Sequence, residues 1–272
     1  MLQFRQMKTV TIALAQIDLA LGQPDQNLET ARAKIAEAKT RGAQVVVLPE
    51  LWSTAYDLER ATAHASALDT GMFAAVADAA RENQIAVVGS LMEMLDGKVY
   101  NTATFIDARG NRVGMYRKLH LVPMLDEDKF LAGGDDAPVF DAEFGKFALA
   151  VCYDLRFPEL WRHYALGGAR VAFLPAEWPI QRIAHWRALL PARAIENQIF
   201  MVGCNRVGTS KDQTFGGHSM IVNPWGEILV EGDDRAALLV AQIDLDMVDD
   251  VRQRVPVFRD RRQDVYSQWS KT

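Results

Sequence analysis

The chain has 272 residues, of which 49% are hydrophobic, 24% charged and 9% aromatic, a composition typical of a globular protein with a large core and unlike that of a disordered chain. Thirty Lys and Arg residues against 35 Asp and Glu residues give a net charge of −5 at pH 7, and no basic stripe favours a nucleic-acid partner. No apolar run approaches the roughly 20 residues that span a bilayer. The first eight residues, MLQFRQMK, lack the features of a signal peptide, so we expect a cytoplasmic protein without a membrane partner.

The predicted elements alternate between strand and helix without a Ser/Gly-rich linker or an internal repeat. We therefore expect one domain over 1–272, with a core at about 9–254 and a polar tail at 255–272 that could reach a partner subunit. In chain order we expect a strand at 9–15, a helix at 28–40, an apolar strand at 45–48, a helix at 72–81, strands at 85–89, 99–107, 112–117 and 147–151, a helix at 159–165, a strand at 171–174, a helix at 183–196, strands at 200–203, 220–223, 228–231 and 240–243, and a helix at 248–254.

The pattern of these elements predicts the fold class. Strands without polar alternation are covered on both faces, so helices are expected on both sides of a sheet. The Ala-Arg-Gly-Asn turn at 108–111 joins its neighbouring strands into an antiparallel hairpin, which makes the sheet mixed. About a dozen strands exceed what one twisted open sheet usually holds. We therefore expect an α/β fold with two packed sheets and helices outside.

The two cysteines, Cys152 and Cys204, are too few for a disulfide scaffold, and neither belongs to a CxxC or Cys/His cluster typical of zinc sites. We expect no metal and no cofactor. Cys152 lies in the segment 152–159, CYDLRFPE, which turns sharply from an apolar strand toward a helix, the arrangement of an exposed nucleophile. Cys204 follows another strand but has no such elbow, and we interpret it as structural.

Two other reactive residues directly follow apolar strands, where α/β proteins collect functional side chains. They are Glu50 and Lys118. Each has a structural alternative, as a solvated strand end or a surface lysine. Functionally, Lys118 could lower the pKa of a nearby thiol, and Glu50 could act as a base if burial raises its pKa. Among the five histidines, His120 and His185 remain candidate bases, so a Cys-His-Asp hydrolase is the alternative mechanism.

The segments LPEL with Glu50, YRKLHL with Lys118 and CYDLRFPE with Cys152 resemble the three signature segments of the nitrilase superfamily of carbon-nitrogen hydrolases. They occur in the family's order, and the resemblance extends from about residue 10 to 266. It implies a four-layer α-β-β-α sandwich with two mixed sheets. It also implies a homodimer or higher homo-oligomer in which the sheets of two subunits form eight layers.

The resemblance further implies a mechanism on a small-molecule amide. Cys152 would be the nucleophile and Glu50 the general base, while Lys118 and the backbone N–H of Tyr153 would stabilise the oxyanion. A thioester would form, and ammonia and a carboxylate would be released. Glu127, in the segment DEDKF, fits a second family glutamate that positions substrate and lysine, although Asp126 is adjacent.

The branch of the family can be narrowed from the residues after the cysteine. Nitrilases proper usually have Trp-Glu there, whereas this chain has Tyr153 and Asp154, which disfavours nitrile hydrolysis. This segment, together with ARAIENQ and GCNRVG further along, is similar to ω-amidases, which hydrolyse the terminal amide of α-ketoglutaramate or α-ketosuccinamate. An acidic substrate needs a cation, and Arg156 or Arg206 could supply it. Alternatively, Arg156 pairs with Asp154 or Glu159, and Arg206 is a surface loop residue.

Aromatic candidates for the pocket wall are Trp52, Tyr56 and Trp178; because aromatic residues are more often core, we favour Trp178 alone. N-carbamoyl amidohydrolase and deaminated glutathione amidase remain alternatives within the fold. A Cys-His acyltransferase or peptidase and a catalytically idle binding module are alternatives from other classes. The intact set of Glu50, Lys118 and Cys152 argues against the idle module.

Overall fold

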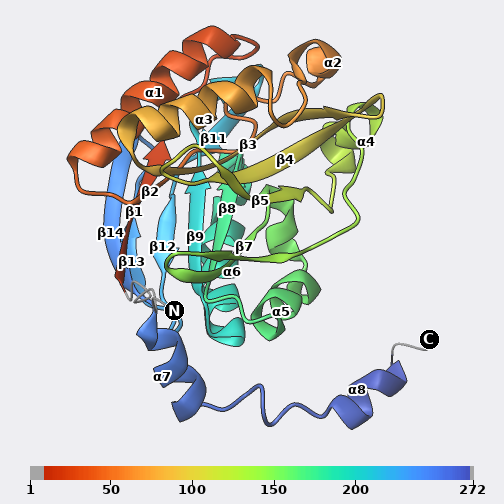
Figure 1. Cartoon of the computed structure of the whole chain (residues 1–272). Coiled ribbons are helices and arrows are strands. Elements are labelled where there is room, and N and C mark those ends of the chain that lie inside the picture. The colour runs from red at the N-terminus through yellow and green to blue at the C-terminus, as the bar shows by residue number, and fades with distance from the viewer. Residues whose placement is uncertain (1–8, 270–272) are drawn as a thin grey trace.

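The computed structural model describes residues 9–269, and in it two six-stranded β-sheets lie between two outer layers of helices (Figure 1). The expected α/β fold with two mixed sheets is confirmed. Residues 1–8, on which the signal-peptide prediction was based, and residues 270–272, the end of the expected tail, lie outside the described residues. No helix in the described part of the chain is long and apolar enough to cross a membrane.

The first sheet has the strand order β14-β1-β2-β3-β4-β5, in which β1, β2 and β3 are parallel and the other pairs antiparallel. Its outer face is covered by α1 and α3 (Figure 1). The elements of this half are β1 (Thr9–Gln16), α1 (Pro24–Thr40), β2 (Val45–Val47), a 3₁₀ turn (Leu58–Arg60), α2 (Ala61–His64), α3 (Gly71–Asn83), β3 (Ala86–Leu95), β4 (Lys98–Ile106), β5 (Arg112–Arg117), a 3₁₀ turn (Pro123–Leu125), α4 (Glu127–Phe130) and β14 (Ala237–Asp244).

The second sheet has the order β13-β12-β9-β8-β7-β6, again with three parallel strands, β7, β8 and β9, at its centre. The helices α5 and α6 cover its outer face (Figure 1). The elements of this half are β6 (Val139–Ala142), β7 (Gly145–Leu149), a 3₁₀ turn (Cys152–Arg156), α5 (Pro158–Leu166), β8 (Val171–Ala176), a 3₁₀ turn (Ile180–Arg182), α6 (Ile183–Asn197), β9 (Phe200–Asn205), β10 (Val207–Ser210), β11 (Gln213–Gly216), β12 (Met220–Val222), β13 (Ile228–Glu231), α7 (Asp246–Arg254) and α8 (Gln263–Trp269).

Strand β1 shows why its sequence is apolar throughout. Ile12 and Leu14 point toward the second sheet, whereas Ala13 and Ala15 point toward α1 and α3. Successive side chains alternate between the faces of a strand, so a strand covered on both faces needs apolar residues at every position. The small alanines let the helices approach the sheet closely. The same logic applies to β2, which carries valines on both faces.

Several elements differ from the prediction. Strand β3 was expected to end at 89 but continues to Leu95 and turns into β4 at Asp96 and Gly97, both with positive φ. The short strands β6, β10 and β11 and the helix α8 in the tail were not predicted. The Asp-Gly pair is a hairpin signal, so the longer β3 was readable from the sequence.

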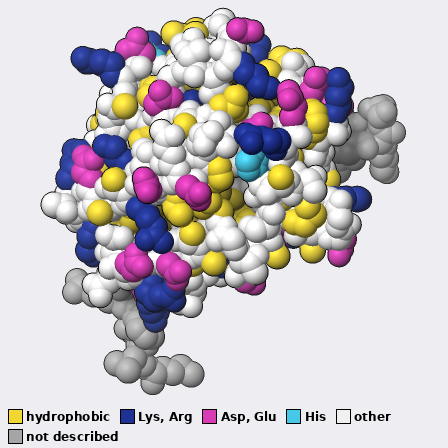
Figure 2. All heavy atoms as spheres, turned by 90° about the horizontal axis from the view of Figure 1, so that it is seen from above, with side chains coloured by type: hydrophobic (Ala, Val, Ile, Leu, Met, Phe, Trp, Pro, Cys, Tyr) yellow, Lys and Arg dark blue, Asp and Glu magenta, His cyan; other side chains and the backbone are white. Residues whose placement is uncertain are grey.

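The surface mixes charges of both signs. Seen from above the helices α1 and α3, acidic and basic side chains alternate over the face without a large patch of one sign (Figure 2). This arrangement agrees with the near balance of 30 basic and 35 acidic residues.

Candidate active site

Cys152 lies at the tip of a sharp turn after β7. Its φ is 44°, in the left-handed region that a residue with a side chain adopts only when its surroundings impose it. The carboxylate of Asp154 imposes it here: Oδ2 accepts hydrogen bonds from the Val151 backbone N–H at 2.9 Å and from the Tyr116 hydroxyl at 2.8 Å. The predicted elbow is therefore present, with a buried aspartate as its brace.

The other oxygen of this aspartate, Oδ1, contacts His120. It lies 2.7 Å from His120 Nδ1 and accepts the His120 backbone N–H at 3.2 Å, while the imidazole stacks on Phe157 at 3.6 Å between ring centres. His185 lies on α6, where its Nδ1 is 3.4 Å from a nitrogen of Arg156. Both histidines thus interact with groups other than the Cys152 thiol, which disfavours the Cys-His alternative.

Glu50, Lys118 and Glu127 meet in one buried cluster. Glu50 follows β2, Lys118 follows β5 and Glu127 begins α4. The Lys118 ammonium donates to Glu50 Oε1 at 2.8 Å and to Glu127 Oε1 at 2.7 Å, and all three side chains are fully buried. Asn101 on β4 donates a further hydrogen bond to Glu50 Oε1 at 2.8 Å. One ammonium is therefore shared by two carboxylates.

Glu127, rather than Asp126, occupies the position next to the lysine. Its Oε2 accepts the Val122 backbone N–H at 2.6 Å, and its Oε1 accepts a short hydrogen bond from the Tyr56 hydroxyl. Asp126 instead pairs with Lys129 at the surface. The carboxylate of Glu127 is thus fixed from three sides, and it fixes the ammonium in turn.

Burial sets the protonation of this cluster. It raises the pKa of Glu50, an effect that the charge of Lys118 opposes. Burial also raises the pKa of the Cys152 thiol well above its ordinary value; the charge of Glu50 adds to this, and that of Lys118 opposes it. Although burial alone would lower the pKa of Lys118, the charges of Glu127 and Glu50 raise it. The expected lowering of the thiol pKa by Lys118 is thus outweighed, and the resting thiol is protonated beside a proton acceptor.

Residue 177, directly after β8, contacts both Cys152 and Glu50. The Glu177 backbone N–H donates to Glu50 Oε2 at 3.0 Å, and its carbonyl oxygen accepts the Cys152 thiol at 3.9 Å. The Glu177 side chain is buried, and burial raises its pKa to about 8 despite an ion pair with Arg206. The main chain just after β8 thus holds both the thiol and the carboxyl group of Glu50.

A cavity of about 300 Å³ opens over the thiol. Cys152 and Tyr153 form part of its wall, and the guanidinium of Arg156 lies 4.6 Å from the centre of the Trp178 ring. Basic groups dominate its polar lining. The acidic, basic and imidazole side chains in this wall are those of Glu177, Arg156, Arg182 and His185. The three predicted substrate-binding residues, Tyr153, Arg156 and Trp178, therefore all face one cavity with Cys152.

The structure corrects the alternatives for the two arginines. Arg156 forms an ion pair with neither Asp154 nor Glu159. Its guanidinium lies against the rings of Tyr153 and Trp178 and beside the imidazole of His185. Arg206 is neither a surface loop residue nor exposed to a substrate, because it is fully buried. It forms ion pairs with Glu177 at 3.2 Å and with Asp18 at 3.1 Å.

Cys204 lies away from the cluster, on β9 between the two sheets. Its thiol donates to the backbone carbonyl oxygens of Val47 at 3.1 Å and Ala15 at 3.6 Å. Burial raises its pKa, and no charged group contributes to that shift. This environment is that of a packed thiol, as we interpreted it.

Sequence reasoning missed three residues of the site. Tyr56 was set aside as a core residue, but its hydroxyl binds Glu127 and its ring lines the cavity, whereas Trp52 is fully packed in the core. Asn101 and Glu177 were not singled out, although Glu177 directly follows an apolar strand, as Glu50 and Cys152 do. The same strand-end criterion would have found it. Within residues 9–269 there is no cluster of three or more His, Cys, Asp or Glu residues suited to a metal ion.

Comparison with known proteins places this arrangement in a family. The family model described as carbon-nitrogen hydrolase matches residues 11–253. The chain belongs to the carbon-nitrogen hydrolase family. A 2-oxoglutaramate amidase from Bacillus subtilis (strain 168) is 39% identical over 257 residues, covering 94% of this chain and 99% of that protein. The human protein named omega-amidase NIT2 is 32% identical over 271 residues, covering 96% of this chain and 98% of its own.

Solved structures of the nitrilase superfamily share the fold. Saccharomyces cerevisiae Nit3 has a TM-score of 0.88 at 26% identity and covers 94% of this chain and 98% of its own. A mutant amidase from Nesterenkonia sp. AN1 has a TM-score of 0.84 at 29% identity over 96% of this chain and 99% of its own. That structure is described as showing Michael addition of acrylamide at the active site cysteine. This carbon-nitrogen hydrolase is thus similar to amidases over nearly its whole length.

Proposed function

We propose that this carbon-nitrogen hydrolase releases ammonia from the terminal amide of a small acidic substrate, with Cys152 as the nucleophile. The observation that carries the proposal is the buried contact between Glu50 and Lys118 at 2.8 Å, next to the Cys152 thiol at its elbow. A thiol, a carboxyl group and an ammonium supply a nucleophile, a proton carrier and a fixed positive charge. These three groups are what amide hydrolysis through a thioester requires.

Acylation begins with the protonated thiol. Glu50 takes the proton as sulfur attacks the amide carbonyl carbon, so a C–S bond forms while the carbonyl π electrons move to oxygen. A base with a raised pKa suits this step, because proton transfer from a thiol of high pKa is then less unfavourable. Collapse of the intermediate breaks the C–N bond, and the nitrogen leaves as ammonia with the proton from Glu50.

The oxyanion of the intermediate needs donors fixed in advance. Lys118 supplies an ammonium held by two carboxylates, and the backbone N–H of Tyr153 follows the nucleophile. One such donor typically contributes about 3 to 4 kcal/mol to transition-state stabilisation. Glu50 then takes a proton from water as the water attacks the thioester, the C–S bond breaks, and sulfur recovers its proton from Glu50. The products are a carboxylic acid and the free thiol.

The acidic character of the substrate is inferred from the cavity. Arg156 has no carboxylate partner among the described residues and lies beside Arg182 and His185. A guanidinium binds a carboxylate in a bidentate manner, so the end of the substrate distant from the amide fits here. The names of the Bacillus and human relatives, 2-oxoglutaramate amidase and omega-amidase, describe amides of this kind.

Ammonia release by purified variants tests the nucleophile and the base. Cys152→Ala is expected to abolish release from an ω-amide such as 2-oxoglutaramate, while Cys204→Ala retains most of it. Glu50→Gln is expected to be inactive, and His120→Ala and His185→Ala only impaired. Equal losses in the two cysteine variants would contradict the nucleophile assignment, and active Glu50→Gln with inactive His120→Ala would favour the Cys-His mechanism.

The same assay identifies the substrate class. A panel of ω-amides, N-carbamoyl compounds, deaminated glutathione and nitriles separates the branches of the family. Arg156→Met is expected to raise KM at least tenfold for an amide that carries a carboxylate and to leave KM nearly unchanged for its uncharged analogue. A preference for N-carbamoyl compounds or nitriles would refute the ω-amidase assignment.

We also propose that the chain forms a homodimer or a higher homo-oligomer. Ile195 on α6 is exposed and lies against the turn that holds Trp225, with exposed Ile228 and Leu229 on the edge strand β13. The helix α8 stands away from the body (Figure 1). Sedimentation velocity is expected to give the wild type a mass that is a multiple of 30.4 kDa, and Ile195→Asp a smaller mass. A wild-type monomer at assay concentrations would contradict this proposal.

A further inference from the structure

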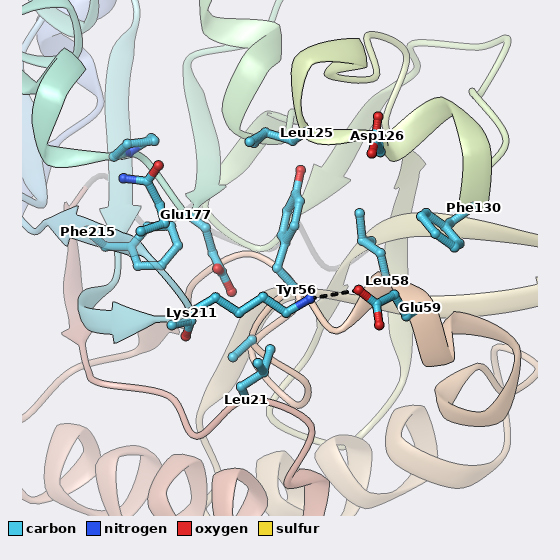
Figure 3. Close-up of a pocket in the computed structure, with 14 residues that line it drawn as sticks. Leu21, Tyr56, Leu58, Glu59, Leu125, Asp126, Phe130, Glu177, Lys211 and Phe215 are labelled. Carbon is cyan, nitrogen blue, oxygen red and sulfur yellow. Dashed lines mark hydrogen bonds and ion pairs between the residues drawn. The ribbon is translucent and has the colours of Figure 1, made fainter.

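A second cavity, of about 240 Å³, adjoins the one over the thiol. Figure 3 shows it between Leu21, Tyr56, Phe215 and the ion pair of Lys211 with Glu59, whose charged atoms are 2.9 Å apart. Its lining is mainly apolar. The two cavities share four lining residues, Tyr56, Leu125, Glu177 and Pro179. Glu177 is the one ionisable carboxyl group among these four.

One oxygen of the Glu177 carboxyl group has no partner. Oε2 accepts a hydrogen bond from Arg206 at 3.2 Å, but Oε1 is buried and forms no hydrogen bond with any described residue. Figure 3 shows this carboxyl group pointing toward the interior of the second cavity. A buried polar atom without a partner costs about 1 to 3 kcal/mol, so its presence calls for a ligand or a function.

The backbone of Glu177 contacts two of the reacting groups. Its N–H holds Glu50 and its carbonyl accepts the Cys152 thiol. In the proposed function, Glu50 gives its proton to the departing nitrogen. The nitrogen therefore lies on the Glu50 side of the thiol. The acyl chain lies on the other side, in the cavity with Arg156. The second cavity and Glu177 therefore border the nitrogen.

We propose that Glu177 and the second cavity form the amine subsite, in which the free oxygen of Glu177 binds the nitrogen of the scissile amide and then the released ammonia. This inference rests on the proposed function and assigns the nitrogen side of the same site. The ligand class is ammonia or a small primary amine. By microscopic reversibility, an amine that attacks the thioester occupies the position from which ammonia left.

The chemistry at this oxygen balances through one proton transfer. Because burial raises the pKa of Glu177 to about 8, its carboxyl group is mostly neutral at pH 7. The neutral group gives its proton to the lone pair of ammonia, so an O–H bond breaks, an N–H bond forms, and ammonium faces a carboxylate. Ammonium then leaves through the cavity, and a proton from solvent restores Glu177.

The test is the partition of the thioester between hydroxylamine and water. Wild-type protein is incubated with an ω-amide and hydroxylamine, and the ratio of hydroxamate to carboxylic acid is measured. The variant Glu177→Gln keeps the shape, but its carbonyl oxygen is needed by Arg206, so an NH₂ group takes the place of the free oxygen. We expect the ratio to fall at least fivefold, because an NH₂ group can neither accept a hydrogen bond from an amine nor give it a proton.

The matched control is Glu93→Gln, which alters another buried glutamate paired with an arginine, Arg117, but lines neither cavity. Its ratio is expected to equal that of the wild type. The ratio counts only turnovers of folded protein, so a loss of stability does not change it. If Glu177→Gln does not yield folded protein, Glu177→Asp, which withdraws the carboxyl group by one methylene, is expected to lower the ratio in the same direction.

The outcomes separate the two proposals. An unchanged ratio in an active Glu177 variant would overturn the amine subsite and leave the proposed function intact. A wild-type chain that releases no ammonia from any ω-amide would overturn the proposed function and the subsite with it. A ratio that falls in Glu177→Gln but not in Glu93→Gln is the result that supports the subsite.

Discussion

The buried carboxyl group of Glu177 couples the stability of the protein to pH. Burial raises its pKa to about 8 from an ordinary value of 4.5, so between these pH values the folded chain binds a proton that the unfolded chain does not. Stability from this group is therefore complete below pH 4.5 and is lost as the pH rises toward 8. Glu177→Gln removes the dependence, since an amide does not titrate.

Urea unfolding at two pH values measures this coupling. From pH 6 to pH 8, the free energy of unfolding of the wild type is expected to fall by about 2 kcal/mol relative to that of Glu177→Gln. The difference between the two proteins isolates Glu177, because Glu50 titrates in both. Parallel changes in the two free energies over this range would show that Glu177 is already ionised at pH 6.

At the scale of residues, a site residue could be predicted from the sequence when it lies directly after an apolar strand. Glu50, Lys118 and Cys152 were found because each directly follows an apolar strand, and such ends meet at one edge of a sheet. Arg206 was misassigned because one of its ion-pair partners, Asp18, is 188 residues away along the chain. Local sequence carries no signal for such a contact.

At the scale of elements, the turn after β7 depends on one side chain. Each oxygen of the Asp154 carboxylate has two polar neighbours. One oxygen accepts hydrogen bonds from the Val151 N–H and the Tyr116 hydroxyl, and the other contacts the backbone and ring nitrogens of His120. Asparagine has one acceptor oxygen, so Asp154→Asn presents an NH₂ group to two donors. The positive φ of Cys152 is then no longer held.

We expect Asp154→Asn to lower kcat about 100-fold, because small displacements of a nucleophile cost about that much. KM is expected to change less than threefold, since most of the cavity wall is formed by other segments and the Arg156 guanidinium lies against the Trp178 ring. Tyr116→Phe removes only one of the donors and serves as the graded control, with a kcat between those of the wild type and Asp154→Asn. A large rise in KM at unchanged kcat would contradict a positioning role for Asp154.

The pattern of apolar residues predicted whether an element is a helix or a strand better than it predicted where the element begins and ends. The strands at 45–48 and 171–174 were predictable because both faces are buried and every residue is apolar. Strand β6 (Val139–Ala142) was missed because it is a short, half-exposed edge strand of mixed composition. Its pairing with β7 is decided by the neighbouring strand rather than by its own residues.

At the scale of the whole molecule, the site is assembled across the two sheets. Glu50 and Lys118 follow strands of the first sheet, whereas Cys152 and Glu177 follow strands of the second. Phenylalanine rings join the sheets, and those of Phe105 on β4 and Phe147 on β7 are 4.6 Å apart. The distance between Glu50 and Cys152 therefore depends on packing between the sheets, which no single segment of sequence encodes.

Two phenylalanine variants separate this packing from stability in general. Phe147→Ala opens a void between the sheets, whereas Phe73→Ala opens one between α3 and the outer face of the first sheet. Both side chains are buried, so each substitution is expected to cost about 3 to 5 kcal/mol. At a temperature where both variants remain folded by circular dichroism, kcat is expected to fall at least tenfold in Phe147→Ala and less than threefold in Phe73→Ala. Equal losses of kcat in the two variants would contradict this expectation. Because Phe73 touches only the outer layer, they would show that kcat follows stability in general and not the packing between the sheets.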